Sequence, residues 1–413
     1  MRGLLAALLV LGCGDDATPA TPDAASDGSR IDAPIDAPID APAIADAALD
    51  AASPDARCAT NAWTIVELAP LGEAPSIVID PQGTMHVAYT TGYRGDVMYG
   101  RRPAGGAFTS EVIAAGQATW STAIAVDRNG GVHVGYQTTA DSFRYGYKPA
   151  GGNWTTELVY APTNIAADEI VSIALDSNDS PHLAFEYVPA QVSIGHAHKG
   201  TGGNWVIDVV ESLGSAGTGG PRLAMRNDAP RIAYPVVNAN LRYAVPASGG
   251  GWTIEQLPSH PEGVGLAVES GGVPDLIYAA YNGTEVALLH SRRDASGTWS
   301  TETAAVGNQP PATCNAGCFP TYGNTIALDG DGSMHVSFAE DDRTSSTMYQ
   351  VLVRYAYRAP GGGWTNEYID GVGAYAGIFN ALALDPAGGV HVVYSYAATN
   401  TSVGSLRHAY RCR

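Results

Sequence analysis

The chain is poor in charged residues, since Asp, Glu, Lys and Arg make up only 15% of its 413 residues, against about 25% in an average soluble protein. Helical proteins are rich in Glu, Lys and Leu, so this shortage argues against an α-helical fold. The 49 Gly and 21 Tyr residues instead favour short strands joined by tight turns. The composition therefore predicts an all-β protein.

Positive charge is scarcest, with 22 Lys and Arg against 41 Asp and Glu and a net charge of −19. This balance argues against nucleic acid as a partner, because phosphates are bound by Lys and Arg. No apolar run approaches the roughly 20 residues that span a bilayer as a helix. The sequence also lacks Gly-x-Ser-x-Gly, His-Glu-x-x-His and a phosphate loop, so no motif identifies catalytic residues.

Residues 1–12 have the pattern of a short export signal, in which Arg2 precedes the apolar run Leu4 to Leu11. The following Val10-Leu11-Gly12-Cys13 resembles the lipobox of bacterial lipoproteins. This resemblance implies cleavage before Cys13, lipidation of its thiol and, because Gly14 follows, an outer-membrane location on the periplasmic side or the cell surface. The alternative is an ordinary signal with a chance Cys. On either interpretation the protein is exported. On the lipobox interpretation, which we favour, its membrane contact is expected through a lipid anchor only.

Residues 13–57 consist of the expected lipidated Cys13 and a segment of Ala, Asp and Pro, in which Ile31 to Pro42 repeats Ile-Asp-Ala-Pro. Such a segment cannot bury enough apolar surface to offset the entropy of ordering it. We expect a disordered, self-repelling tether, followed by one folded domain over residues 58–413.

That domain repeats one unit, which is clearest from Thr325 to Ile369. The unit has an apolar strand ending in Asp, a Gly turn, a His-Val strand, a loop, an Arg-Tyr-Ala-Tyr strand, and a Gly-Gly turn before Trp-Thr-x-Glu. The second-strand position recurs as His86, His133, His182, Arg231, Asp275, His335 and His391, and the Trp position as Trp63, Phe108, Trp154, Trp205, Trp252, Trp299 and Trp364. Seven four-stranded units, mostly 44 to 51 residues apart, predict a seven-bladed β-propeller with antiparallel blades.

The first and last copies are incomplete in complementary ways. The segment Trp63 to Leu68 is a fourth strand without its first three, and Asn380 to Arg413 holds three strands without a fourth. We therefore expect the N-terminal strand to complete the last blade and close the ring, which leaves no open edge.

Four cysteines remain after Cys13, and they allow three disulfide connectivities. Cys58 precedes the orphan fourth strand and Cys412 follows the last third strand, positions that flank a tight turn in a complete blade. Cys314 and Cys318 lie in one long loop. The pairing Cys58–Cys412 with Cys314–Cys318 needs the least distortion and is the prediction.

The repeated residues have structural interpretations. Equivalent His residues on different blades are too far apart to share one metal ion, so each is expected to pack between blades or to bond to the Asp before its turn. That Asp is expected to cap backbone N–H groups, and the Trp to pack on the outer strand. We expect no cofactor and no metal, with calcium at Asp329 and Asp331 as an alternative that lacks a full ligand set.

The repeat resembles the BNR or sialidase-like repeat class over almost all of residues 63–413. The sialidase Asp-box, Ser-x-Asp-x-Gly-x-Thr-Trp, has no full match. Sialidases have six blades, three convergent Arg and a Tyr–Glu pair, whereas Arg144, Arg242, Arg354 and Arg407 share one third-strand position here. These four Arg are expected on an exposed blade face, so no catalytic triad is assigned.

Strand parity places the short Gly-rich turns on one face of the ring and the loops of variable length on the other. Variable loops on a rigid scaffold are where binding sites usually lie. The ligand-binding candidates there are Trp120, Glu169, Tyr322, Asp341, Arg343 and Tyr375, with Asp168, Glu186, Glu340, Asp342 and Phe379 as further candidates.

These observations favour a monomeric cell-envelope lipoprotein whose propeller binds a glycan or protein ligand through its variable-loop face. One alternative is a sialidase-like glycoside hydrolase, which needs two carboxyls about 5–9.5 Å apart. The other is a structural scaffold without a small ligand. Whether any catalysis occurs stays open at this point.

Overall fold

The computed structural model describes residues 62–161, 170–200, 202–259, 261, 263–281, 286–306, 324–345, 348–399 and 404–412. These residues form strands, turns and loops, with no helix among them. In the described part of the chain, therefore, nothing has the length and apolarity of a bilayer-crossing helix. The expectation of an all-β chain is confirmed.

Five separate four-stranded antiparallel sheets form blades 1 to 5, in chain order. Blade 1 contains β2 (Glu73–Ile79), β3 (Met85–Thr90), β4 (Val97–Arg102) and β5 (Thr109–Ala114). Blade 2 contains β6 (Ala118–Val126), β7 (Val132–Thr138), β8 (Phe143–Lys148) and β9 (Thr155–Tyr160). Blade 3 contains β10 (Val171–Leu175), β11 (Pro181–Tyr187), β12 (Val192–Lys199) and β13 (Trp205–Gly214). Blade 4 contains β14 (Arg222–Arg226), β15 (Ala229–Pro235), β16 (Leu241–Pro246) and β17 (Trp252–Leu257), and blade 5 contains β18 (Val264–Val268), β19 (Pro274–Tyr281), β20 (Val286–Arg293) and β21 (Trp299–Val306).

The remaining eight strands form one sheet that comprises two blades. Blade 6 contains β22 (Thr325–Leu328), β23 (Met334–Ser345), β24 (Met348–Arg358) and β25 (Trp364–Asp370). Blade 7 contains β26 (Tyr375–Leu384), β27 (Val390–Ala397), β28 (Ser405–Arg411) and, from the start of the domain, β1 (Thr64–Ala69). A single parallel bridge between Val351 and Tyr375 joins the two blades.

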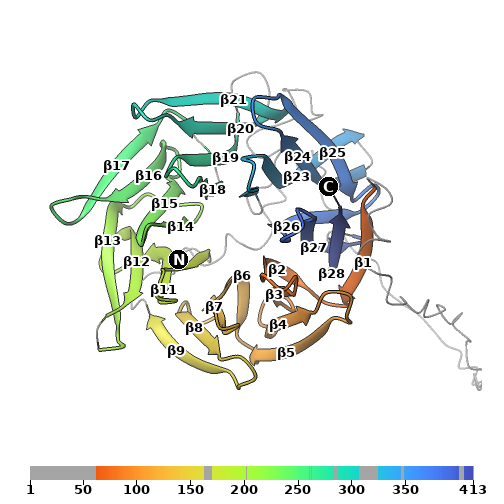
Figure 1. The fold of residues 1–413 in the computed structure, drawn as a ribbon, viewed down its shortest axis with the longest axis horizontal. Coiled ribbons are helices and arrows are strands. Elements are labelled where there is room, and N and C mark those ends of the chain that lie inside the picture. Colours follow the sequence, from red (N-terminus) through yellow and green to blue (C-terminus); the bar gives the residue numbers. More distant parts are fainter. Residues whose placement is uncertain are drawn as a thin grey trace, which may run out of the picture. The chain divides into compact units, whose positions relative to one another are not determined.

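The ring closes as the sequence predicts. Strand β1 pairs antiparallel with β28, from Thr64 opposite Tyr410 to Ala69 opposite Leu406. Figure 1 shows the orange β1 beside the dark blue β28, with the blades arranged in a ring. The first and last strands of the domain thus share one sheet, which removes the open edge that an unclosed array would have.

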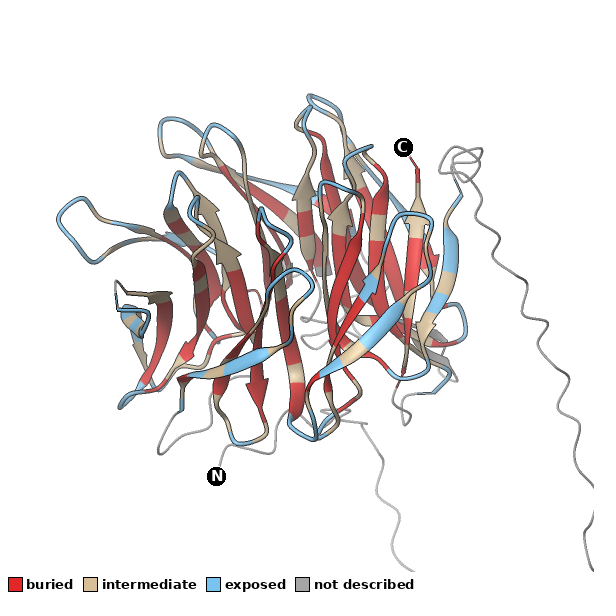
Figure 2. Cartoon of the chain, turned by 60° about the horizontal axis from the view of Figure 1, so that its bottom comes forward, coloured by how far each residue is buried: buried red, intermediate tan, exposed pale blue. Residues whose placement is uncertain are grey.

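Side chains between neighbouring blades form the core. The second strands are the most buried, as in β3 and β7, in which every residue is buried. One cluster joins Val97 and Tyr99 of blade 1 to Val132 and Val134 of blade 2, and similar clusters recur around the ring. Figure 2 shows this gradient, with buried inner strands and exposed residues on the outermost strands and turns.

Several strands are longer than the sequence suggests, so some residues expected in loops lie in strands. Trp120 is in β6, Glu186 in β11, Glu340 to Arg343 in β23, and Tyr375 and Phe379 in β26. Strands β23 and β24 are longer than expected because they pair as one long hairpin. Strands β6 and β26 are longer because β-bulges let them extend toward the variable-loop face. Cys13, Cys58, Asp168, Glu169, Cys314, Cys318 and Tyr322 lie outside the described residues.

Candidate functional site

The repeated Asp and His residues hold the short turns in place. In blade 1, Oδ1 of Asp80 accepts the backbone N–H groups of Gln82 and Thr84 at 2.9 and 2.7 Å. The Nε2 atom of His86 lies 3.2 Å from Oδ2 of Asp80, and its Nδ1 lies 2.7 Å from the Tyr99 hydroxyl. Burial lowers the pKa of His86, which favours the neutral ring. The arrangement recurs at His133 with Asp127 and at His391 with Asp385, so the structural interpretation of these residues is confirmed.

Each Trp of the repeat packs on the blade that precedes its own. The edge-to-face pairs, with centroids 5.2–5.5 Å apart, are Trp63–Tyr355, Trp154–Tyr99, Trp205–Tyr145, Trp252–His196, Trp299–Tyr243 and Trp364–His290. The packing role expected for the Trp row is confirmed.

The Glu of Trp-Thr-x-Glu has a role that the sequence did not reveal. The Nε1–H of Trp299 donates to Glu255 of the preceding blade at 2.8 Å, and Nε of Arg293 donates to the same carboxylate at 2.8 Å. We call this combination of a fourth-strand Glu with a cation and a Trp from the next blade the inter-blade joint. It recurs at Glu111, Glu302 and Glu367.

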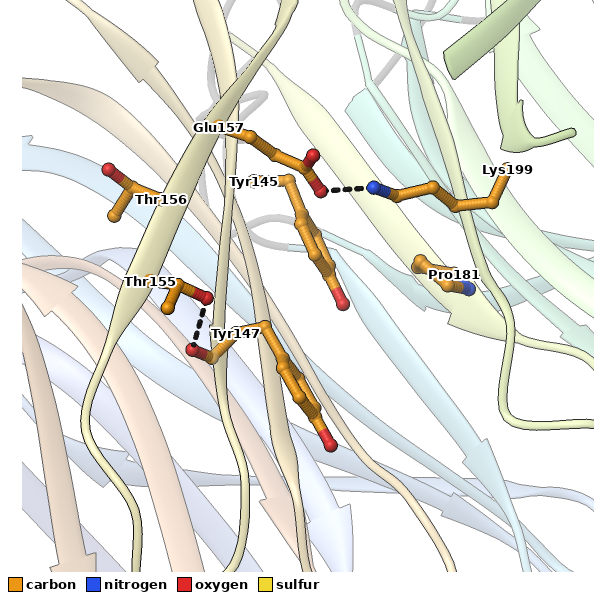
Figure 3. Close-up of a pocket in the computed structure, with 7 residues that line it drawn as sticks. All are labelled: Tyr145, Tyr147, Thr155, Thr156, Glu157, Pro181 and Lys199. Atoms are coloured by element: carbon orange, nitrogen blue, oxygen red, sulfur yellow. Dashed lines mark hydrogen bonds and ion pairs between the residues drawn. The ribbon is translucent and has the colours of Figure 1, made fainter. Parts of the chain in front are cut away.

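A cleft of about 280 Å³ opens between blades 2 and 3 and is lined by Tyr145, Tyr147, Glu157, Lys199 and neighbouring residues. Figure 3 shows the Glu157 carboxylate directed at the Lys199 ammonium across the cleft. An equivalent cleft of about 290 Å³ lies between blades 4 and 5. Both are at or below the lower limit of typical small-molecule pockets, about 300 Å³, and their charged groups already pair with each other. These clefts are therefore weaker candidates for a ligand site than the variable-loop face.

On the variable-loop face, two of the candidate aromatics meet. The Trp120 ring stacks with Phe379 at a centroid distance of 6.0 Å and an interplanar angle of 5°, and with Tyr93 at 5.7 Å and 18°. The three rings come from different blades, since Tyr93 follows β3 of blade 1, Trp120 is in β6 of blade 2, and Phe379 is in β26 of blade 7. We call Tyr93, Trp120 and Phe379 the aromatic stack.

Two β-bulges direct these rings. The β6–β7 register shifts between Ala118 and Thr122, and the β26–β27 register shifts between Ala376 and Asn380. Trp120 and Phe379 lie inside the shifted segments, and a bulge re-aims the side chains that it contains. Gly377 in the second bulge has φ +82°, and a Cβ atom there would come within 2.5 Å of Cβ of Val353. Only glycine fits this backbone path.

The loop that carries Tyr93 is fastened to the strand that carries Trp120. The Arg94 N–H donates to the Ala118 carbonyl at 2.8 Å, and the Ala118 N–H donates to the Gly95 carbonyl at 2.9 Å. The Arg94 guanidinium lies 5.5 Å from the centre of the Tyr93 ring. Tyr93 remains 46% exposed, while Trp120 and Phe379 are half-buried. Tyr93 is thus the most exposed ring of the stack, and hydrogen bonds to Ala118 fix the backbone of its loop.

Sequence reasoning singled out Trp120 and Phe379 but missed Tyr93. The signal was available, because Thr91-Gly-Tyr93-Arg94-Gly is an unrepeated aromatic loop between the second and third strands of its blade. Tyr375 is half-buried at the first residue of β26, the strand that also carries Phe379. For Asp341 and Arg343 the structure gives the backbone position within β23.

The recurrent third-strand Arg residues correct one expectation. They were expected on an exposed blade face, but Arg354 is only 5% exposed, and its Nη1 donates to Glu340 Oε2 at 2.7 Å. Nη1 of Arg407 donates to Asp370 Oδ2 at 2.8 Å. The expectation failed because the long β23–β24 hairpin brings a buried carboxylate, Glu340, beside Arg354. Glu340 and Arg354 therefore neutralise each other inside the blade.

The Asp329 turn resembles the other Asp turns. Asp329 Oδ1 accepts the Asp331 N–H and Asp331 Oδ1 accepts the Ser333 N–H, each at 2.8 Å. This is the turn-capping role expected for the repeated Asp, and calcium at this turn stays an untested alternative to the prediction of no metal.

No protein-family model and no curated protein matches the chain. Several solved structures resemble it. The polysaccharide lyase Uly1 has 11% sequence identity and a TM-score of 0.52, covering 84% of this chain and 90% of Uly1. An ulvan lyase of polysaccharide lyase family PL25, bound to -[GlcA(1-4)Rha3S]-, has 11% identity and a TM-score of 0.54, covering 84% of this chain and 96% of the lyase. At such identities the likeness concerns the fold alone.

Proposed function

We propose that this protein is an exported, lipid-anchored propeller that binds a glycan on its variable-loop face, with the aromatic stack at the centre of the site. The observation that carries the proposal is the convergence of Tyr93, Trp120 and Phe379 from three blades. Exposed aromatic rings on a backbone fixed by hydrogen bonds are a usual feature of binding surfaces, because such rings bury a large area on binding and lose little conformational entropy.

The chemistry of the stack suits a sugar ring. Tyr93 offers an exposed apolar ring with a hydroxyl, and the Arg94 guanidinium beside it supplies hydrogen-bond donors. A sugar has apolar C–H faces and a rim of hydroxyl acceptors, which these two groups complement. The same combination would be less suited to a flat apolar ligand, for which the cation would have to be desolvated without a partner.

The fold is compatible with this proposal, since the solved structures that resemble the chain include polysaccharide lyases. The signal-like residues 1–12 and the lipobox-like Val10 to Cys13 support a location at the cell envelope. A propeller anchored there by a long tether would have access to extracellular or periplasmic polysaccharide.

The test is a glycan array probed with the mature chain, followed by calorimetric titration of each hit. We expect Tyr93→Ala to weaken binding about tenfold or more, as removal of an aromatic anchor usually does. Tyr368→Ala is the matched control, because Tyr368 on β25 is similarly exposed, at 44%, and lies outside the stack. Equal loss in both variants, or no effect of Tyr93→Ala on any hit, would contradict the proposed site.

The same titrations separate the alternatives. Products shorter than the added glycan, detected by mass spectrometry, would indicate cleavage, and a hydrolase would require a free carboxyl pair near the site. Glu340 does not provide one, because Arg354 neutralises it. An array and a pull-down that both come back empty would favour a scaffold without a small ligand.

A further inference from the structure

Blade 3 differs from blade 2 at three positions that face one another. In blade 2 the third strand carries Tyr145 and Tyr147, and the fourth strand carries Glu157. The equivalent residues of blade 3, counted from Lys148 and Lys199 and from the two Trp residues, are His196, His198 and Asp208. Two phenols and a glutamate are thus replaced by two imidazoles and an aspartate.

The three side chains converge. His196 is directly opposite Asp208 in the β12–β13 pairing, and His198 is two residues further along the same face of β12. Oδ2 of Asp208 lies 3.7 Å from Nδ1 of His196 and 3.6 Å from Nδ1 of His198. Both Nδ1 atoms are buried and have no hydrogen-bond partner among the described residues. Two unsatisfied nitrogens therefore face one carboxylate oxygen across a gap too long for a hydrogen bond.

The contacts on the far side of His196 bear on which of its nitrogens holds the lone pair. Nε2 of His182 faces the Asp176 carboxylate at 3.8 Å, and its Nδ1 lies 2.9 Å from Nε2 of His196. When the proton of neutral His182 is on Nε2, toward the carboxylate, His182 Nδ1 is the acceptor and His196 Nε2 is the donor. In a neutral ring the lone pair of His196 is then on Nδ1, directed at Asp208. A lone pair and a carboxylate repel each other unless a cation lies between them.

From this geometry we propose that His196, His198 and Asp208 bind a divalent transition-metal ion, with zinc as the probe. Zinc binds imidazole nitrogen and carboxylate oxygen at about 2.0–2.2 Å, which puts neighbouring ligand atoms of a tetrahedron about 3.4 Å apart. The observed 3.6 and 3.7 Å need only small adjustments. His182 supplies the outer hydrogen-bonded partner that a metal-ligating His residue commonly has, since its Nδ1 lies 2.9 Å from Nε2 of His196.

The site would be open to solvent on one side. The side chains of His198 and Asp208 are 32% and 50% exposed, whereas that of His196 is 5% exposed. Three protein ligands leave one position of a tetrahedral ion for water or a ligand atom. Two imidazoles and a carboxylate also suit nickel, copper and iron(II), so zinc identifies the site and not the physiological metal.

The chain offers variants that keep the fold. His196→Tyr and His198→Tyr install the residue type found at these positions in blade 2, where the Tyr145 hydroxyl bonds to His133, and a tyrosine at position 196 can bond to His182 in the same way. The matched control is His408→Tyr in blade 7, since His408 occupies the position of His196 and contacts His391 in the same way, at 3.0 Å. Asp208→Asn removes the carboxylate charge with almost no change in volume.

The experiment is calorimetric titration of zinc chloride into the untagged, chelator-treated mature chain, with cobalt(II) absorption as a second readout. We expect one equivalent of zinc to bind, at least about 100-fold more weakly in His198→Tyr and Asp208→Asn, and unchanged in His408→Tyr. A tetrahedral cobalt spectrum should appear and be lost in the same variants. A wild-type chain that binds neither ion, or that binds them no better than His198→Tyr, overturns the proposal. If His198→Tyr does not fold, Asp208→Asn decides between the two outcomes.

Discussion

The inter-blade joint at Glu255 can be tested by removing its shared carboxylate. Glu255 accepts the Trp299 Nε1–H and the Arg293 Nε–H, both at 2.8 Å, and so joins blade 4 to blade 5. A hydrogen bond to a charged group contributes about 1.5–3 kcal/mol when buried. The Arg293 and Glu255 side chains are 33% and 25% exposed, so solvent screening reduces each bond toward about 1 kcal/mol. We expect Glu255→Ala to lower the free energy of unfolding by about 2 kcal/mol and Glu255→Gln, which keeps one acceptor, by about half of that.

Urea unfolding followed by Trp fluorescence measures this change, and Thr253→Ala, an exposed residue on the same strand, controls for strand propensity. A double-mutant cycle with Trp299→Phe isolates the indole bond, because Phe keeps most of the ring packing on Tyr243. We expect a coupling free energy of about 1 kcal/mol. A cost for Glu255→Ala no larger than that of Thr253→Ala, together with zero coupling, would refute the interpretation of the joint as a stabilising contact.

Three further outcomes are expected. Burial lowers the pKa of His86, and lowers that of His196 to about 3. Because the unfolded chain then binds more protons than the folded chain below about pH 6.5, the free energy of unfolding should fall as the pH drops from there. Urea unfolding midpoints that stay constant from pH 8 to 5, with chelator present, would contradict this. Burial raises the pKa of Glu73, so Glu73→Gln should stabilise the protein at pH 7, with an advantage over wild type that disappears below about pH 4.5. Peptide mapping without reductant should recover Cys58 linked to Cys412, and reduction should lower the melting temperature; free thiols at both positions would refute the pairing.

The fold could be predicted from the sequence because every blade contacts the next one in nearly the same way. The Trp at the start of a fourth strand recurs since it packs on the preceding blade, as Trp154 does on Tyr99, and the Asp and His recur since they hold each short turn. The offset of the first and last copies then located the ring closure. Local propensity and repeat register were sufficient for this, because neighbouring contacts dominate a repeat protein.

The candidate site was predicted only in part because its residues are not repeated. Trp120 and Phe379 were identified as unrepeated aromatics, but their meeting across blade 1 depends on two bulges that no periodic pattern encodes. Tyr93 was missed because the hydrogen bonds that tie its loop to Ala118 of the next blade are not visible in the sequence. The Arg354–Glu340 pair was missed because the length of the β23–β24 hairpin decides which side chains are buried.

Blade 3 shows how one blade of a repeat can acquire new chemistry while it keeps its packing against the next blade. Trp252 packs on His196 at 5.4 Å, edge to face, much as Trp205 packs on Tyr145 at 5.3 Å. The imidazole therefore replaces the phenol as a packing partner, and the apolar contact between the blades is kept. The polar groups at these positions differ between the two blades. In blade 3, His196, His198 and Asp208 supply two imidazole nitrogens and a carboxylate. In blade 2, Tyr145, Tyr147 and Glu157 supply two hydroxyls and a carboxylate that is paired with Lys199. Since each blade contacts mainly its neighbours, such a substitution leaves the other joints intact, and the proposed metal site is separate from the proposed glycan site on the variable-loop face.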